Sequence, residues 1–464
     1  MEDYGLLQLI AAFASYFILP SKIFPYWITR FVARGFKASK TGLIVNLLLS
    51  IPSFALFLLA SSRMAPVIGA NIVYFIAFAF QLPLMYVVTS LEAIGTGAKP
   101  HVLGYGYSVF EGAKVILCVL MVVALNFRLL GVIVAIVASY IIQSLALLLM
   151  LRGVLTGRFD PGLVRRWTKM SWLPLYHEAS AAVYMLIFLT LTWFTRSTEP
   201  VALMVASEVA TIPIVYTSFL AGGLYPRLLS GGGRADIESS LKLVLMLAIP
   251  ATVGTFILAQ PILRILRPEY AVASFILMVL TVKGFIKALA GIPSAIILGV
   301  ERVDVDERPS FRDYVKSKLF LLPTLAWLAN GVSATLMLII AWYGVSRGMS
   351  YITLVFNYVL TDLLIVGIPF NVYLWLVSRR MAPFKLPTKS ISRYSFSAAI
   401  MALFLILFYP KISGVSLAQT LLATLPIIGG GAVIYFSILL AIDKESRFLA
   451  RSLIGLILAT VKRL

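Results

Sequence analysis

Apolar segments of about 20 residues recur along the whole chain, and they limit the possible folds more than any other feature of the sequence. A helix needs about 20 predominantly apolar residues to cross the roughly 30 Å hydrocarbon layer of a membrane. Because lipid offers no hydrogen bonds, a spanning segment must bond its backbone internally, as a helix does. The sequence therefore predicts an all-α, multi-pass (polytopic) membrane protein.

About thirteen spans can be marked, joined by short loops. They lie at 4–28, 41–61, 70–89, 104–125, 129–150, 171–193, 201–224, 241–259, 270–298, 319–342, 351–377, 394–408 and 418–442. Hydrophobic residues make up 61% of the 464 residues and charged residues only 12%. This composition leaves no room for a large soluble domain.

The net charge of +20, from 39 Lys and Arg against 19 Asp and Glu, is typical of nucleic-acid-binding proteins as well as of some membrane proteins. The positions of the charges decide between the two. If the spans alternate and the C-terminus is cytoplasmic, 28 of these basic residues lie on the cytoplasmic side, seven lie outside and four lie within spans. This asymmetry follows the positive-inside rule. It predicts a multi-pass protein of the cytoplasmic cell membrane, with a cytoplasmic C-terminus and no nucleic-acid partner.

Few residues are suited to catalysis or metal binding. The chain has one cysteine, Cys118, inside an apolar span, two histidines and no P-loop sequence. Neither a clustered acidic motif nor a set of metal ligands is visible. We therefore expect no enzyme activity, no metal and no cofactor, apart from an unidentified coupling ion.

Two segments of the chain resemble each other. EDYGLLQLIAAF and the residues after it align with TEPVALMVASEV and its continuation, and an offset of 197 or 198 pairs Arg30 with Arg227 and Pro52 with Pro250. Each copy has a helix that starts at an acidic turn, a basic loop and a helix with a central proline. Either the chain contains a parallel repeat of two lobes, or the two segments are generic helical hairpins.

The repeat implies a division of the chain. We expect a first lobe at 1–156, an interfacial linker at 157–170, a second lobe at 171–378, an extra helical pair at 379–442 and a cytoplasmic amphipathic tail at 443–464. In the second lobe a full helix precedes the acidic turn, whereas in the first lobe none does. The first lobe is therefore expected to lack one helix.

Several short motifs carry a family resemblance. They are EDYGLL at 2–7, FPYWITRFVARG at 24–35, PILRILRPEYAVA at 261–273, LGVERVD at 298–304 and IDKESRFLARSL at 442–453. In this order and spacing they resemble the polysaccharide-biosynthesis flippases of the MOP superfamily, which include Wzx-type and MurJ-type proteins. Such proteins have two six-helix lobes and two further helices. The thirteen spans would then be the second to fourteenth helices of the family.

The resemblance implies a flippase that moves a lipid-linked oligosaccharide across the membrane by alternating access. Such a protein is expected to act as a monomer, among membrane lipids and beside glycosyltransferases. Two alternatives remain. A MATE-type exporter of small molecules, coupled to a cation, shares the two lobes but has twelve helices and acidic cavity residues. An intramembrane glycosyltransferase or polymerase should show a larger polar loop or a motif such as DDxxD, and neither is present in this sequence.

Ionisable residues within the spans are the natural candidates for a transport site, because each is costly in lipid unless it is paired or hydrated. The substrate-cavity candidates are Lys22, Arg30, His177, Glu178 and Glu208, and the secondary candidates are Lys283, Lys287 and Asp362. The resemblance places the helices that carry Lys22, His177 with Glu178, and Glu208 along the central cavity.

Lys22 lies eight residues before Arg30, or about 12 Å along a helix, too far to reach the cytoplasmic surface easily. Our hypothesis is that Lys22 contacts the anionic headgroup, with Glu178 as its partner in the empty cavity. A purely structural ion pair is the alternative. Lys283 and Lys287 share a helix face and need partners elsewhere, for which Asp362 is a candidate.

Two further patterns concern local structure. Glu111 and Lys114, three residues apart, are expected to neutralise each other on one helix face. The prolines at 20, 25, 213 and 293 are expected to interrupt helical hydrogen bonding within spans, either as hinges or as static kinks.

Overall fold

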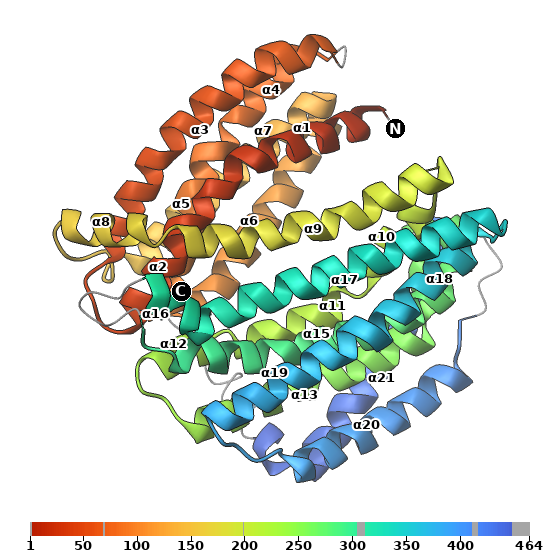
Figure 1. Cartoon of the computed structure of the whole chain (residues 1–464). Helices are drawn as coiled ribbons and strands as arrows, with labels where there is room; N and C mark the ends of the chain where they lie inside the picture. The colour runs from red at the N-terminus through yellow and green to blue at the C-terminus, as the bar shows by residue number, and fades with distance from the viewer. Residues whose placement is uncertain (1, 68–69, 198, 304–310, 411–415, 448–464) are drawn as a thin grey trace. The chain divides into compact units, whose positions relative to one another are not determined.

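The computed structural model describes residues 2–67, 70–197, 199–303, 311–410 and 416–447, and within these ranges all regular structure is helical. Contacts divide the chain into two compact units. The first comprises Met1–Ala179 and Tyr225–Gly232, and the second comprises Ser180–Leu224 and Gly233–Leu464. Each unit is described separately below, and Figure 1 labels the helices of both.

The first unit contains every described helix up to Lys169, the start of the next helix and most of α12. Its elements are α1 (Glu2–Ile18), the 3-10 turn η1 (Leu19–Lys22), α2 (Ile23–Ala33), α3 (Ser39–Val67), α4 (Ile72–Ala79), α5 (Gln81–Ala98), α6 (His101–Cys118), the π-helical η2 (Val119–Ala124), α7 (Arg128–Leu151), α8 (Pro161–Lys169), the beginning of α9 (Trp172–Thr195) and most of α12 (Leu224–Leu229). Figure 1 shows α3, α4 and α7 running side by side.

The first predicted span is not one continuous helix, because it is interrupted at η1. Pro25 has no N–H to donate to the carbonyl of Ser21 four residues earlier. Asn46 of α3 donates to this carbonyl instead, at 3.2 Å, and the Tyr86 hydroxyl of α5 donates to the carbonyl of Phe17 at 2.8 Å. Side chains of neighbouring helices thus satisfy backbone groups at the break, as a membrane segment requires.

An aromatic core holds the α1 end of this unit together. Phe57, Phe75 and Leu82 are at most 1% exposed and pack with Ile10 of α1. The Phe13 ring lies edge-on or tilted to its neighbours, 5.5 Å from Phe57. Such ring pairs add to the burial energy of this core.

The second unit contains the remaining helices. They are the rest of α9, α10 (Glu199–Ala210), α11 (Ile212–Tyr216), the 3-10 turn η3 (Thr217–Ala221), α13 (Arg234–Ile257), α14 (Ala259–Leu266), η4 (Pro268–Ala273), α15 (Ser274–Val300), α16 (Phe311–Lys316), α17 (Lys318–Ser346), α18 (Tyr351–Asp362), the π-helical η5 (Leu363–Gly367), α19 (Ile368–Met381), α20 (Thr388–Leu407) and α21 (Leu417–Ile442). Its core includes Met204, Ile276, Leu277 and Tyr358, all fully buried.

Prolines interrupt the helix near 210 but not the one near 293. Pro213 stands at the start of α11, and the axis bends by 40° between Glu199–Ala210 and Ile212–Leu229. Pro293, by contrast, lies inside the continuous α15. The two repeated segments therefore share a local pattern: a helix broken near a proline, then a long helix, α3 or α13, that contains Pro52 or Pro250.

The last two helices, α20 and α21, pack on α13 and on each other. Glycines allow α21 to approach α20 closely, since a Cβ at Gly431 would lie 2.9 Å from Leu405. The Tyr435 hydroxyl of α21 donates to the carbonyl of Met246 in α13 at 2.7 Å. The pair is thus an integral part of the second unit.

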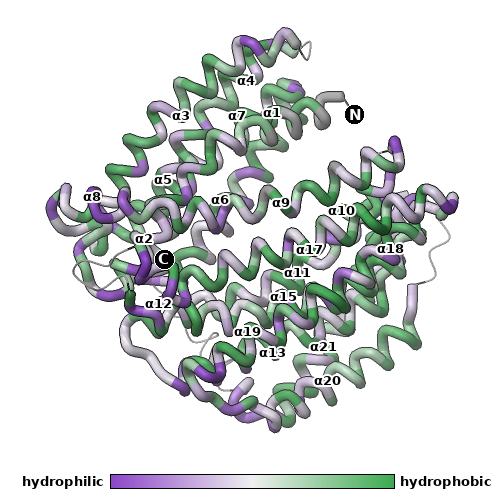
Figure 2. The backbone as a smooth tube through the Cα atoms, in the orientation of Figure 1, coloured by the Kyte–Doolittle hydropathy of each residue, from purple (hydrophilic) through white to green (hydrophobic). Residues whose placement is uncertain are grey.

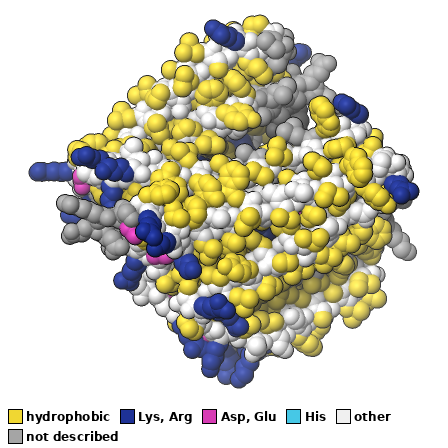
Figure 3. Space-filling model, in the orientation of Figure 1, with side chains coloured by type: hydrophobic (Ala, Val, Ile, Leu, Met, Phe, Trp, Pro, Cys, Tyr) yellow, Lys and Arg dark blue, Asp and Glu magenta, His cyan; other side chains and the backbone are white. Residues whose placement is uncertain are grey.

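Among the described residues, eleven helices are long and apolar enough to cross a membrane, or twelve if the bent pair is one span. Each predicted span coincides with a helix or a run of short helices. The first is missing from this count because α1 has only 17 residues before the break. Figure 2 shows apolar segments along the helices, and Figure 3 shows hydrophobic side chains on their visible sides, with Lys and Arg concentrated at the edges. The protein is a multi-pass membrane protein, as predicted.

The predicted amphipathic tail is described only at its beginning. The backbone leaves α21 at Asp443 and is helical again at 444–447, and residues 448–464 lie outside the described part of the chain.

Candidate functional site

Lys22 is the last residue of η1, at the break in the first span. Its side chain is exposed, whereas Ser21 and Phe24 beside it are buried. At this interruption the lysine side chain lies outside the packed interior of the first unit.

Glu92 of α5 is the acidic residue associated with Lys22. Its carboxylate accepts hydrogen bonds from the buried Gln143 at 3.3 Å and from the Tyr107 hydroxyl, and it interacts electrostatically with Lys22. The interacting groups come from η1, α5, α6 and α7, so the packing of the first unit assembles them. This cluster of Lys22, Glu92, Tyr107 and Gln143 is called the N-unit cluster below.

Glu92 is not among the residues predicted from sequence because the predicted span ended at residue 89, whereas α5 continues to Ala98. Extending the span by one turn would have included it among the intramembrane charges. Glu178, the partner expected for Lys22, is half-buried in α9, and the described residues contain no ion pair between Lys22 and Glu178. His177, next to it, is exposed.

Arg30, a substrate-cavity candidate just beyond the first predicted span, is fully buried. One of its guanidinium nitrogens lies 3.4 Å from the hydroxyl of Tyr225 in α12. Two residues close to Arg30 in sequence also make tight contacts: the Thr29 hydroxyl donates to the carbonyl of Ala93 at 3.1 Å, and Trp27 is fully buried. Arg30 thus belongs to the packed interior of the first unit.

A second polar cluster lies in the core of the second unit. Lys283 of α15 forms an ion pair with Asp362 of α18 at 2.5 Å, which confirms the pairing considered from sequence. Asp362 also accepts a hydrogen bond from Ser333 of α17. The Tyr184 hydroxyl of α9 donates to Glu208 of α10 at 2.6 Å. These five residues are called the C-unit cluster below.

The ring of Tyr358, one turn before Asp362, is fully buried close to both carboxylates of the C-unit cluster and interacts with them electrostatically. Two carboxylates against one lysine leave this cluster with one excess negative charge when all three are ionised. Lys287, one turn after Lys283, is exposed. The expected pairing of Glu111 with Lys114 is confirmed, at 2.7 Å.

The structure thus brings together Glu208, Lys283 and Asp362, and separately gives Lys22 a partner that was not expected. In the described part of the chain no group of three or more His, Cys, Asp or Glu residues could hold a metal ion.

Comparison with known proteins gives no match to a family model and none to a curated protein sequence. Solved structures do share the fold. An outward-facing multidrug-resistance MATE transporter of the MOP superfamily is 12% identical, with a TM-score of 0.59 over 82% of this chain and 87% of its own. The chain has the fold of the MOP-superfamily transporters.

Two further structures with the MOP fold agree. A MATE transporter in its straight conformation is 13% identical, with a TM-score of 0.61 over 81% of this chain and 87% of its own. A MOP-superfamily transporter from Pyrococcus furiosus, described as having a binding pocket of reversed polarity, is 14% identical, with a TM-score of 0.58 over 82% of this chain and 87% of its own. These likenesses confirm the predicted fold class.

Proposed function

We propose that this MOP-fold protein is a flippase that moves a lipid-linked oligosaccharide across the cytoplasmic membrane by alternating access. The observation that carries this proposal is the exposed Lys22 at the break of the first span, with Glu92 beside it. We further propose that the protein is not an enzyme, and that it acts as a monomer beside glycosyltransferases, with its C-terminus in the cytoplasm.

The substrate class explains why a lysine is useful at this position. A lipid-linked oligosaccharide carries a phosphate or diphosphate that cannot enter hydrocarbon without a compensating charge. An ammonium group supplies this charge and, with its flexible stem, can follow a moving headgroup. In the empty protein Glu92 lowers the cost of keeping Lys22 ionised, and a bound phosphate would take over part of that role.

The helix breaks support transport by a conformational change. Both η1 and the bend near Pro213 interrupt backbone hydrogen bonding within a span, and side chains such as Asn46 replace the lost bonds at η1. Discontinuous helices of this kind recur at the substrate sites of transporters, where their free ends face a cavity.

A MATE-type, cation-coupled exporter of small molecules is the second candidate. It is favoured by the solved structures that share the fold and by the excess negative charge of the C-unit cluster, where Glu208 and Asp362 lie near a single lysine. Such an exporter would need an exchangeable cation, and it would not need a lysine at position 22.

The two candidates can be separated with purified protein in liposomes. The first assay follows a fluorescent polyprenyl-diphosphate oligosaccharide, with dithionite quenching to report on which leaflet it occupies. The second follows efflux of a cationic dye driven by an imposed Na⁺ or proton gradient. We expect the wild type to flip the lipid-linked sugar and to leave the dye gradient unchanged.

Three variants test the role of Lys22 in the flipping assay. Lys22→Gln should reduce the flipping rate at least ten-fold, because loss of a charge-assisted phosphate contact costs about 1.5–3 kcal/mol. Lys22→Arg should retain most of the rate, and the matched control Lys114→Gln, which removes a lysine paired on another helix, should not change it. Flipping by Lys22→Gln at the wild-type rate, or gradient-driven dye efflux without flipping, would reject the proposal.

A further inference from the structure

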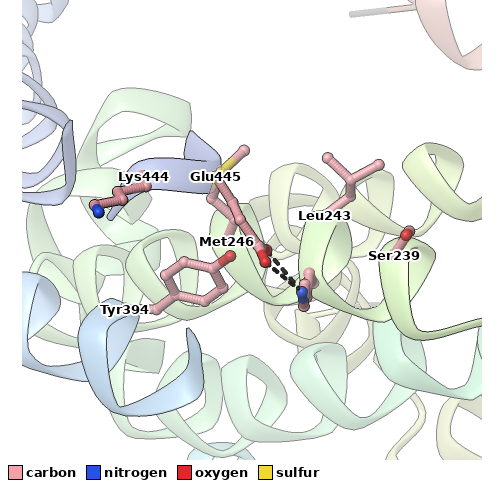
Figure 4. Close-up of a pocket in the computed structure, with 7 residues that line it drawn as sticks. Ser239, Leu243, Met246, Tyr394, Lys444 and Glu445 are labelled. Atoms are coloured by element: carbon pink, nitrogen blue, oxygen red, sulfur yellow. Dashed lines mark hydrogen bonds and ion pairs between the residues drawn. The ribbon is translucent and has the colours of Figure 1, made fainter. Parts of the chain in front are cut away.

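Three helix ends meet at one side of the second unit and line an open pocket. They are the beginning of α13, the beginning of α20 and the end of α21 with the helical turn at 444–447. In Figure 4, Glu445 reaches across to α13 and Tyr394 points from α20 toward the same helix. Since polar headgroups lie where apolar helices end, the pocket is expected at the membrane interface.

Buried polar contacts fix the frame of this pocket. Asp443, which is fully buried, forms an ion pair with Arg393 of α20 at 2.6 Å and accepts hydrogen bonds from the N–H and the hydroxyl of Ser446. Burial alone would raise the pKa of Asp443, but the bonds from Ser446 and Arg393 outweigh it and hold the pKa below its usual value. The turn that carries Lys444 and Glu445 is thereby attached to α20.

The pocket has a volume of about 410 Å³, within the range of roughly 300–1,000 Å³ typical of sites for small molecules. Its lining is divided by chemistry. Leu243, Met246 and Tyr394 provide apolar surface, and Lys242, Lys444 and Glu445 provide charge, with Ser239 beside them. Such a lining suits a ligand that is charged at one end and apolar at the other.

The lining carries two cations and one anion. Lys242 contacts both oxygens of Glu445, at 2.8 and 2.7 Å, and the dashed lines in Figure 4 mark these bonds. Lys444 is exposed and forms no ion pair with any described residue. The excess positive charge of the pocket is therefore available to an anion, and Glu445 competes with that anion for Lys242.

We infer that this pocket binds the phosphate headgroup of an anionic phospholipid, with Lys444 and Lys242 at the phosphate and Leu243, Met246 and Tyr394 against the glycerol and first acyl carbons. Basic pockets between membrane helices have the charge and the position to bind such headgroups. This site is separate from both polar clusters, and it does not depend on the transport function proposed above.

The test uses the purified full-length protein in a neutral detergent, with phosphatidylglycerol, phosphatidylcholine or inorganic phosphate added. Native mass spectrometry counts bound lipid, and the thermal unfolding midpoint reports the effect of binding. We expect phosphatidylglycerol to bind and raise the midpoint, and the other two to have little effect. Adding or removing one basic side chain beside an anionic lipid changes the dissociation constant by about five-fold.

Three variants identify the pocket. Lys444→Gln should weaken phosphatidylglycerol binding about five-fold, and Glu445→Gln should strengthen it by a similar factor because Lys242 loses its competitor. Lys389→Gln removes an exposed lysine of α20 that does not line the pocket, and it should bind like the wild type. Equal binding of both lipids, an equal loss in the Lys444 and Lys389 variants, or full replacement by inorganic phosphate would each overturn the inference.

Discussion

Removal of Lys283 should destabilise the protein strongly, since it would leave Asp362 without a cation in the core of the second unit. The two groups are 2.5 Å apart, and their side chains are only 26% and 2% exposed. At an effective dielectric constant of about 20 their Coulomb attraction is about 7 kcal/mol, most of which offsets desolvation. Breaking such a pair from one side typically costs about 3–5 kcal/mol, and we expect this loss for Lys283→Met.

The assay is unfolding of the detergent-solubilised protein by increasing SDS in mixed micelles, which yields a free energy of unfolding for each variant. Lys114→Gln is the matched control. Its ion pair with Glu111 is 2.7 Å long, but the side chains are 32% and 60% exposed, so we expect a loss within about 1 kcal/mol.

The double variant Lys283→Met with Asp362→Leu completes the cycle. Because it leaves no unpaired charge, it should recover most of the stability lost in Lys283→Met. If Lys283→Met costs no more than Lys114→Gln, or if the double variant is less stable than the single one, the reasoning about a buried, mutually dependent pair is refuted.

Three other predictions concern single positions. Because the pKa of Asp443 is lowered in the folded protein, its contribution to stability should be present at neutral pH and lost below about pH 4. The thermal unfolding midpoints of the wild type and Asp443→Asn should therefore differ at neutral pH and converge below about pH 4. Gly97→Ala should lower the free energy of unfolding in SDS by about 1–3 kcal/mol, since the added Cβ would lie 2.9 Å from the carbonyl oxygen of Thr29. Gly104→Ala serves as the control, because a Cβ at Gly104 would have no atom within 4 Å. Asn46→Ala should cost about 1–2 kcal/mol in the same assay, and a negligible loss would contradict its role at the helix break.

The apolar hydrocarbon layer of the membrane explains why so much of the architecture could be predicted. A span must be apolar over its full length, so the thirteen segments and the all-helical class were visible in the sequence. Helix breaks were predicted correctly at Pro20, Pro25 and Pro213, where the missing N–H is a local property of the residue. Pro293 shows the limit, because α15 continues through it.

The candidate sites were less predictable, because ion pairs join residues that are far apart in the chain. Lys283 and Asp362 are 79 residues apart, and the sequence could offer Asp362 only as one candidate partner for Lys283 and Lys287. Glu92 was overlooked because the end of a span cannot be located to within one helical turn. Arg30 looked like a loop residue, and only tertiary packing buries it against α12.

The sequence by itself determined that this chain spans the membrane as helices, that basic residues gather in alternate loops and in the C-terminal tail, and that prolines interrupt particular spans, because each of these depends on local composition. Only the tertiary structure decided which charges on different helices neutralise one another and which lysines, such as Lys22 and Lys444, are exposed. The physical reason is that pairing requires helices distant in sequence to approach within about 3 Å, and packing rather than composition sets that distance.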